Sequence, residues 1–119
     1  MKNKVKALAQ HLGVSKKDIE QSTYDENIFE FVGQEYLVVT DEEADDLWEQ
    51  ELDNYLEECI YPELTGNLAN YFDDEKWKRD AKFDGRGHSL GRYDGCEEEI
   101  TLTDKEGDEI ETFYIYRTN

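Results

Sequence analysis

The first apolar residues of the chain recur at helical spacing and predict a short N-terminal helix. These residues are Val5, Leu8, Ala9 and Leu12, and Gly13 follows as a C-terminal cap. Ser15, with Asp18 three residues later, predicts the cap of a second short turn. The segment "LAQHLGVSKKDI" resembles the front half of a helix-turn-helix. However, acidic, strand-like residues follow at the position where such a motif has its DNA-recognition helix. We therefore expect no direct nucleic-acid binding here.

A β-hairpin is predicted next, over "NIFEFVGQEYLVVT". Two runs rich in Phe, Tyr, Ile and Val flank Gly33-Gln34, which fits a type II′ turn with glycine first.

Thr40 then predicts the start of a long helix, because Glu43 stands at the third helical position and completes a capping box. One face of this helix is apolar and predicts a core contact that includes Cys59. The face comprises Ala44, Leu47, Trp48, Leu52, Tyr55, Leu56, Cys59 and Ile60. Pro62 marks the end of the helix or the first turn of the next one.

The second half of the chain predicts two short helices and a second hairpin. The first helix spans 62–72, with an inner face of Leu64, Leu68 and either Tyr71 or Phe72. Asp73 caps the second, whose Trp77 and either Ala81 or Phe83 point inward. A glycine-rich loop, "DGRGHSLGRYDG", leads to alternating strands at 97–103 and 111–118, joined near Glu106-Gly107.

These elements predict an α+β fold, a small single domain that covers residues 1–119. Its expected parts are an N-terminal helix, a β-hairpin, a long acidic helix, two short helices and a C-terminal β-hairpin. The chain of 119 residues, with 13% aromatic residues, is sufficient for a modest core. We find no run of roughly 20 apolar residues and no apolar signal segment at the start. We expect a protein of the bacterial host cytoplasm that does not contact membranes.

Charge is distributed in blocks, and the net charge is −18. Residues 18–75 carry 20 acidic side chains and no Lys or Arg, whereas residues 76–92 carry six basic and two acidic ones. A field of this sign repels DNA, RNA and anionic membranes and attracts basic surfaces.

The long helix carries an acidic column opposite its apolar face. Glu42, Asp46, Glu49, Asp53 and Glu57 step by three or four residues, over roughly 22 Å of helix. Like charges at this spacing each cost a few tenths of a kcal/mol in helix stability. We predict a partner-binding surface here, made of Glu42, Asp45, Asp46, Glu49, Asp53, Glu57 and Glu58.

Three interpretations of the column stay open. One carboxylate per helical turn is similar in scale to a phosphate ladder, so the column could occupy a groove made for nucleic acid. It could also be a plain solvated face, or bind another kind of partner. The basic island Lys76, Lys78, Arg79, Lys82, Arg86 and Arg92 could pair with it internally, which would weaken mimicry, or could form a second contact patch or the face of a homodimer.

The segment from Tyr61 to Gly85 resembles the C-terminal signature of ArdA-type antirestriction proteins. The matching positions are Tyr71, Phe72, Asp73, Glu75, Arg79 and Asp80, after a leucine-rich segment. The resemblance covers about a fifth of the chain, and the earlier acidic segments of that family have no recognisable counterpart. It implies an elongated acidic DNA mimic that inhibits restriction enzymes.

A second resemblance covers more of the chain but is less specific. The stretches "EYLVVTDEEADD", "DGRGHSLGRYDGCEEE" and "FYIYRTN" are similar to small phage proteins of unknown function. This resemblance implies an origin in a phage or prophage.

Catalytic and metal chemistry find little support in the sequence. His88 stands near Asp84, Ser89 and Asp94, but without paired-ligand spacing. The clusters at 73–75 and 96–99 do not follow the EF-hand pattern, and neither cysteine has a nearby His to activate it. We expect no enzyme activity, no catalytic residues, no metal and no cofactor.

The sequence thus predicts an acidic phage or mobile-element protein that inhibits a host defence enzyme, either a restriction complex or a CRISPR effector. Its expected partner is the basic groove of a host nucleic-acid-binding protein. The alternative is a small interaction or regulatory module without mimicry.

Overall fold

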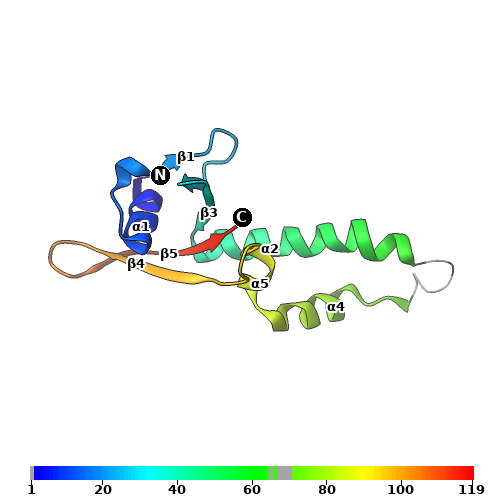
Figure 1. Ribbon diagram of the computed structural model, residues 1–119. Helices are drawn as coiled ribbons and strands as arrows, with labels where there is room; N and C mark the ends of the chain where they lie inside the picture. The colour runs from blue at the N-terminus through cyan, green and yellow to red at the C-terminus, as the bar shows by residue number, and fades with distance from the viewer. Residues whose placement is uncertain (1, 65, 67–70) are drawn as a thin grey trace.

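A computed structural model describes residues 2–64, 66 and 71–119, and it shows a long helical arm projecting from a sheet (Figure 1). The fold is α+β. In chain order, its main elements are α1 (Lys2–Leu12), β1 (Glu20–Gln21), β2 (Ile28–Phe31), β3 (Gln34–Val39), α2 (Asp41–Tyr55), α4 (Asp74–Ala81), α5 (Arg86–Leu90), β4 (Glu98–Thr103) and β5 (Glu109–Arg117).

Both predicted hairpins belong to one antiparallel sheet. Within the described residues its strand order is β1-β2-β3-β5-β4. The hairpins join along β3 and β5, where Val38 is paired with Ile115. This junction makes β3 and β5 interior strands of the sheet, and their buried residues belong to clusters on both faces.

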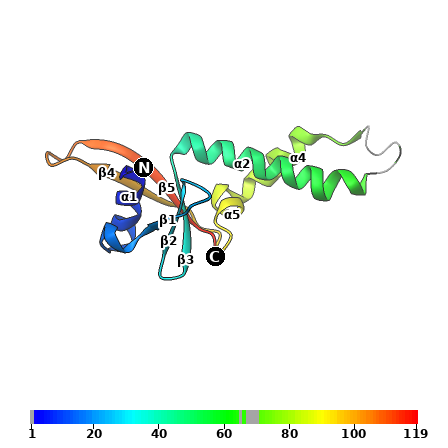
Figure 2. The same ribbon diagram turned by 90° about the horizontal axis from the view of Figure 1, so that it is seen from above.

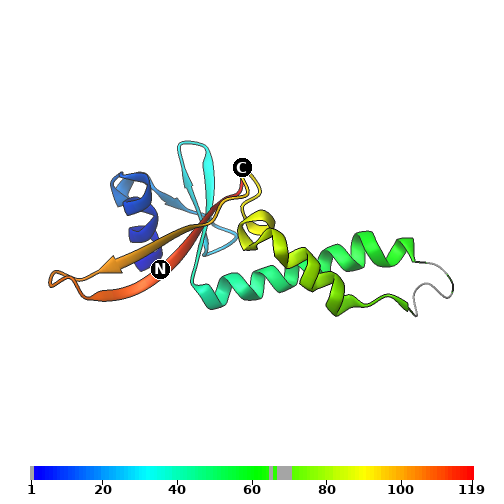
Figure 3. The same ribbon diagram turned by 90° about the horizontal axis from the view of Figure 1, so that it is seen from below.

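Alternation along the strands divides the core into two clusters. One face of the sheet packs against α1 and includes Phe29, Val38 and Phe113. The opposite face packs against the start of α2 and against α5. Figure 3 shows α1 on one side of the strands and the helices α2 and α5 on another. This second cluster consists of Ile28, Leu37, Val39, Ala44, Leu90 and Tyr116.

The turn of the first hairpin differs from the prediction. Phe31 pairs with Gln34, so the two turn residues are Val32 and Gly33 rather than Gly33 and Gln34. Both have positive φ, 50° and 77°, which corresponds to a type I′ turn. The strand register decides the turn, and it places a β-branched residue in the left-handed region. Val32 is 80% exposed, so the strain lies at the tip of the hairpin.

The long helix begins as predicted and ends differently. Thr40 accepts a hydrogen bond from the Glu43 backbone, and Glu43 in turn accepts one from Thr40, which confirms the capping box. After Tyr55 the helix widens into a π-helical turn, Leu56–Ile60. The prediction that Cys59 lies in the core is wrong, because it is exposed. A π-helical turn holds more residues than an α-helical turn, which changes the faces on which later positions lie.

The segment from Tyr61 to Asp84 confirms some predictions and corrects others. Asp73 caps α4 by accepting a hydrogen bond from the Lys76 backbone. Phe83 does not point inward, since it is 83% exposed. The short helix predicted over 62–72 includes Leu68, which lies outside the described residues. Tyr61–Glu63, just before it, forms a 3-10 turn.

The glycine-rich segment contains a helix, α5, where the sequence predicted a loop. Gly85 has φ of 87°, as expected of a turn glycine. Gly87 and Gly91 serve a different purpose, because a Cβ at Gly91 would lie 2.6 Å from the Cys96 carbonyl oxygen. They allow α5 to press against the chain at 95–97, and this contact sets the position of Arg86.

The molecule is elongated, with extents of 60 × 31 × 21 Å. Its radius of gyration is 17.4 Å, against about 13.5 Å for a compact chain of this length. Figure 2 shows the cause: α2 and α4 continue together beyond the sheet. We call these helices, with the turns Leu56–Ile60 and Tyr61–Glu63, the arm, and the sheet with α1 the head.

Candidate functional site: the acidic arm

The predicted partner-binding residues all lie on α2 and the π-helical turn that follows it. Six of them, Glu42, Asp45, Asp46, Asp53, Glu57 and Glu58, are exposed, and Glu49 is half-buried. The structure therefore presents most of these carboxylates to solvent. It does not present them as one uncompensated column, because cations from α4 and α5 reach several of them.

Lys78 of α4 neutralises the middle of the column. Its ammonium nitrogen lies 3.1 Å from a carboxylate oxygen of Glu49 and 2.5 Å from one of Asp53. Glu49 forms a further ion pair with Lys82. These pairs connect two helices whose backbones make little direct contact, so side-chain charge contributes to holding the arm together.

Arg86 of α5 neutralises the base of the arm. Its guanidinium lies 2.8 Å from carboxylate oxygens of both Asp41 and Asp45, and 2.7 Å from Glu97, next to β4. It also stacks over Tyr114 of β5, 4.7 Å from the ring centre. Its side chain is only 11% exposed. Arg86 thus connects the start of α2, the strand β5 and the chain before β4 at the joint between head and arm.

Four carboxylates of the predicted set have no ion pair within the described part of the chain: Glu42, Asp46, Glu57 and Glu58. They form two groups, one near the base of α2 and one toward its far end. Among the six cations of the basic island, Lys78, Lys82, Arg86 and Arg92 pair with α2, whereas Lys76 and Arg79 form no ion pair with described residues. Internal pairing therefore describes most of the island.

The ion pairs shift pKa values in the directions expected. Hydrogen bonds from Lys82 and then Lys78 lower the pKa of Glu49. Hydrogen bonds to Asp53 and Glu49 raise the pKa of Lys78. Burial opposes the charge of Arg86, but its bonds to Glu97, Asp41 and Asp45 prevail and raise its pKa. Lys78 and Arg86 therefore stay positively charged across the physiological pH range.

A cleft lined by aromatic side chains, which we call the arm cleft, lies between the helices of the arm. The rings of Tyr55 and Trp77 stack, with centroids 5.5 Å apart and planes within 11°. Beside them is a cavity of about 480 Å³ between α2, α4 and α5. Sequence periodicity identified Trp77 as an inward residue, but it could not reveal the cavity, since that depends on how the helices meet.

The candidates for catalytic or metal chemistry lie apart. His88 is exposed at one end of the arm cleft, with Asp84 and Ser89, and the Ser89 hydroxyl accepts a hydrogen bond from the Trp48 indole at 3.2 Å. Among the described residues, Asp104, Glu106 and Asp108 bring three carboxylates within 4.8 Å, all exposed. The backbone N–H groups of Glu106 and Asp108 bond to the Asp104 carboxylate, so this cluster orders a hairpin turn.

Cys96, which has no activating His nearby in the sequence, borders a small pocket that His11 also lines. His11 of α1 and Cys96 line one small pocket of about 200 Å³, together with Asp94, Glu98 and Arg117. The packing of α1 across the sheet brings these distant residues together. The sequence carries no signal of this proximity, because 84 residues separate the two positions.

Comparison with known proteins gives no relative. No family model matches the chain, and no similar curated protein or solved structure is found. The resemblances noted from the sequence therefore stay predictions. Within the described ranges, none of the helices has the length and apolar character needed to cross a membrane.

Proposed function

We propose that this protein binds the Lys/Arg-lined groove of a nucleic-acid-binding enzyme of host defence and blocks it by competition. The observation that carries the proposal is charge on an elongated body. A net charge of −18 along a 60 Å axis gives one charge per about 3.3 Å, which equals the density of a single DNA strand (about 3.4 Å) and is about half that of a duplex (about 1.7 Å). A groove that attracts a phosphate backbone attracts this molecule for the same reason.

The charge acts as a property of the whole body rather than of one column. Lys78 and Arg86 remove much of the electrostatic field of α2 locally, so Glu42, Asp46, Glu57 and Glu58 are the carboxylates of the predicted set that stay unpaired among the described residues and can contact a partner. The head adds further exposed acidic side chains at the tip of the β4–β5 hairpin. Steering by the whole field speeds the encounter, and the arm then makes specific contacts.

The choice of a restriction or CRISPR enzyme as the target rests on the sequence resemblance. The elongated, acidic form supports the competitive mechanism, but does not select between these enzymes. Charge alone screens away with salt, so hydrophobic anchors must add specificity to such a complex.

The experiment is a pull-down from bacterial lysate with the tagged protein, washed at low and then at high salt, followed by competition with duplex DNA or guide-loaded complex. We expect a nucleic-acid-binding enzyme that salt releases and that duplex displaces. A partner that resists both salt and duplex would overturn the proposal.

Two charge-reversed variants with equal net charge sharpen the test. The first replaces the unpaired residues of the predicted set, Glu42, Asp46, Glu57 and Glu58, by Lys. The control replaces the hairpin residues Glu106, Asp108, Glu109 and Glu111 by Lys. We expect the arm variant to lose inhibition of the captured enzyme and the control to lose much less. Equal retention by both variants would contradict competition through the arm.

A second candidate function, an interaction module without mimicry, draws support from the internal ion pairs. If α2 uses its carboxylates mainly to hold α4, the exposed aromatic residues of the arm become the binding surface. Tyr55 and Tyr61 are 50% and 39% exposed. A complex of this kind persists at high salt, which separates it from competition for a basic groove.

A further inference from the structure

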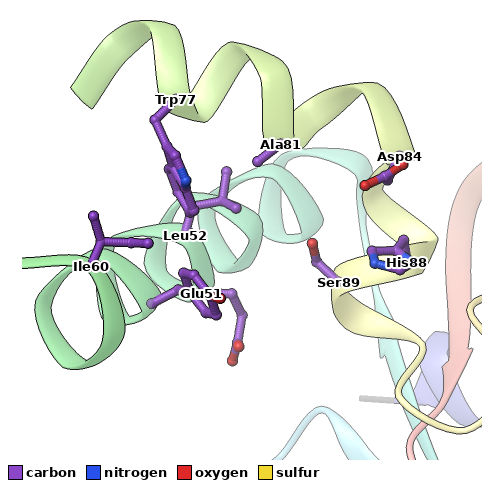
Figure 4. Close-up of a pocket in the computed structure, with 9 residues that line it drawn as sticks. Glu51, Leu52, Ile60, Trp77, Ala81, Asp84, His88 and Ser89 are labelled. Carbon is purple, nitrogen blue, oxygen red and sulfur yellow. The ribbon is translucent and has the colours of Figure 1, made fainter. Parts of the chain in front are cut away.

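The arm cleft has an apolar end and a polar end. Leu52 and Ile60 lie at the apolar end with Trp77, and Figure 4 shows these three side chains grouped between the helices. Asp84, His88 and Ser89 lie at the other end, and Glu51 also lines the cavity. A single occupant therefore meets an apolar surface and carboxylates within one cavity.

The apolar end is incompletely filled by the protein itself. Leu52 is buried, but Trp77, Ile60 and Ala81 are half-buried, although they face the same space. Ala81, which has a small side chain, lines the cavity together with Trp77 and Leu52. A concavity of this size lined by apolar and aromatic side chains is typical of a binding site.

The carboxylates at the polar end favour an occupant that carries positive charge. Asp84 is exposed and has no ion pair with any residue that the structure describes. Glu51 pairs with Arg92 at 3.0 Å, but the Arg92 side chain is 66% exposed, so a competing cation can replace it. The net charge of −18 reinforces this preference at long range.

We propose that the arm cleft binds a basic segment of the protein partner, with one apolar side chain inserted beside Trp77 and Ala81 and a flanking Lys or Arg against Asp84. Charge complementarity argues for this occupant over an acidic or purely apolar one. Tryptophan and tyrosine dominate binding energy at protein interfaces, and both line this cavity. The inference rests on the proposed function, because it identifies the anchor that competition for a basic groove requires.

The test uses the full chain and three synthetic peptides of about four helical turns. The first peptide has a Leu stripe flanked by Lys, the second has Gln in place of Leu, and the third has Glu in place of Lys. The Trp77 indole N–H signal in NMR titrations reports occupancy of the cleft. We expect the Leu/Lys peptide to shift it, the Gln/Lys peptide to bind weakly without shifting it, and the Leu/Glu peptide not to bind.

Two substitutions test the two ends separately. Ala81→Leu fills the cavity from within while adding apolar contact, and we expect it to weaken the Leu/Lys peptide about ten-fold. Asp84→Asn removes the carboxylate, and we expect a loss of about three-fold for that peptide at low salt that vanishes at high salt. Ile110→Ser, at an exposed position on β5, is the matched control and leaves affinity unchanged. The Trp48 indole signal, recorded before peptide is added, reports that the arm of each variant stays folded.

Three results would overturn the inference. One is equal binding of the Leu/Lys and Gln/Lys peptides, and another is unchanged affinity in Ala81→Leu. The third is a concentration-dependent dimer that shifts Trp77 without peptide and that Ala81→Leu disrupts, since a second copy would then occupy the cleft.

The proposed function can fail separately. If Ala81→Leu still inhibits the captured enzyme while the arm charge reversal does not, competition stands and the cleft is not its anchor. If the Leu/Lys peptide binds as expected but duplex never displaces the captured partner, the cleft inference stands and mimicry fails.

Discussion

The ammonium nitrogen of Lys78 lies 2.5 Å from a carboxylate oxygen of Asp53, and 3.1 Å from one of Glu49 one helical turn earlier. One lysine of α4 thus bridges two successive acidic residues of α2. The side chain of Lys78 is 23% exposed, whereas those of Glu49 and Asp53 are 45% and 54% exposed, so the bridge lies at the surface of the arm. Lys78 thus reduces the repulsion between two carboxylates of α2 and at the same time links α2 to α4.

Replacing Lys78 should loosen the arm. We expect Lys78→Met to lower the free energy of unfolding by about 1 kcal/mol, because two ion pairs are lost and Glu49 and Asp53 then repel each other. Urea unfolding measures the loss, and amide hydrogen exchange locates it in α2 and α4. Lys76→Met is the control, since Lys76 is exposed and forms no ion pair with described residues. An equal effect in both variants would contradict the bridging role.

Arg86 should be irreplaceable by lysine. Its planar guanidinium contacts Asp41, Asp45 and Glu97 and stacks on Tyr114, and an ammonium group cannot do all of this at once. We expect Arg86→Lys to destabilise the protein by about 2 kcal/mol and to change the near-ultraviolet circular dichroism of the tyrosines. Arg92→Lys, at a 66% exposed side chain, should change neither measurement.

The contribution of Glu49 to folding stability should decrease as the pH falls. Its pKa in the folded protein is lowered from 4.5, first by the hydrogen bond from Lys82 and then by that from Lys78. The group therefore adds stability that is present above pH 4.5 and is lost as pH falls through the folded pKa. We expect the stability difference between the wild type and Glu49→Gln to shrink over that acidic range. A difference that stays constant down to pH 3 or so would argue against the pairing.

The matched comparison cancels the general effect of acid. Protonation of many carboxylates reduces the net charge of −18 and relieves repulsion throughout the molecule, in both proteins alike. At alkaline pH the sign is opposite, because the pKa of Lys78 is raised in the folded protein. The stability that Lys78 contributes is therefore present below pH 10.5 and is lost as the pH rises through its pKa in the folded state.

Gly91 should tolerate no side chain. A Cβ there would lie 2.6 Å from the Cys96 carbonyl oxygen and 2.9 Å from that of Gly87. We expect Gly91→Ala to cost about 2 kcal/mol in unfolding free energy, because backbone must shift and α5 moves away from the chain. Gly95→Asn is the control: its φ is 70°, which Asn accepts, and no atom approaches within 4 Å. Similar losses for both would show that the close approach is not what matters.

The local predictions that succeeded depend on residues close together in sequence. The capping box of Thr40 and Glu43 needs only three residues of separation, and the cap of α4 by Asp73 is equally local. Gly13 likewise ends α1 with φ of 69°. Such signals are readable because the hydrogen-bonding partners are fixed by the helix itself.

The errors arose where a local pattern competes with tertiary register. Gly33 suggested a glycine-first turn, but pairing of Phe31 with Gln34 moved the turn to Val32-Gly33. Cys59 continued the apolar periodicity, yet a π-helical turn from Leu56 onward changed the phase and left it exposed. Gly87 and Gly91 were predicted to be loop residues. Their role is to allow close packing against the backbone of Cys96, and this packing is visible only in the tertiary structure.

The sequence by itself determined most of the elements, though not α5, together with the α+β class and the strongly negative electrostatic field, because periodicity, capping and formal charge need no knowledge of distant contacts. Tertiary structure decided which carboxylates stay unpaired. The chain distance from Asp45 to Arg86, or from Asp53 to Lys78, is too long for any sequence rule, and the pairs form because α5 and α4 return along α2. The same return creates the cleft beside Trp77, since a cavity belongs to the space between helices and not to any one of them.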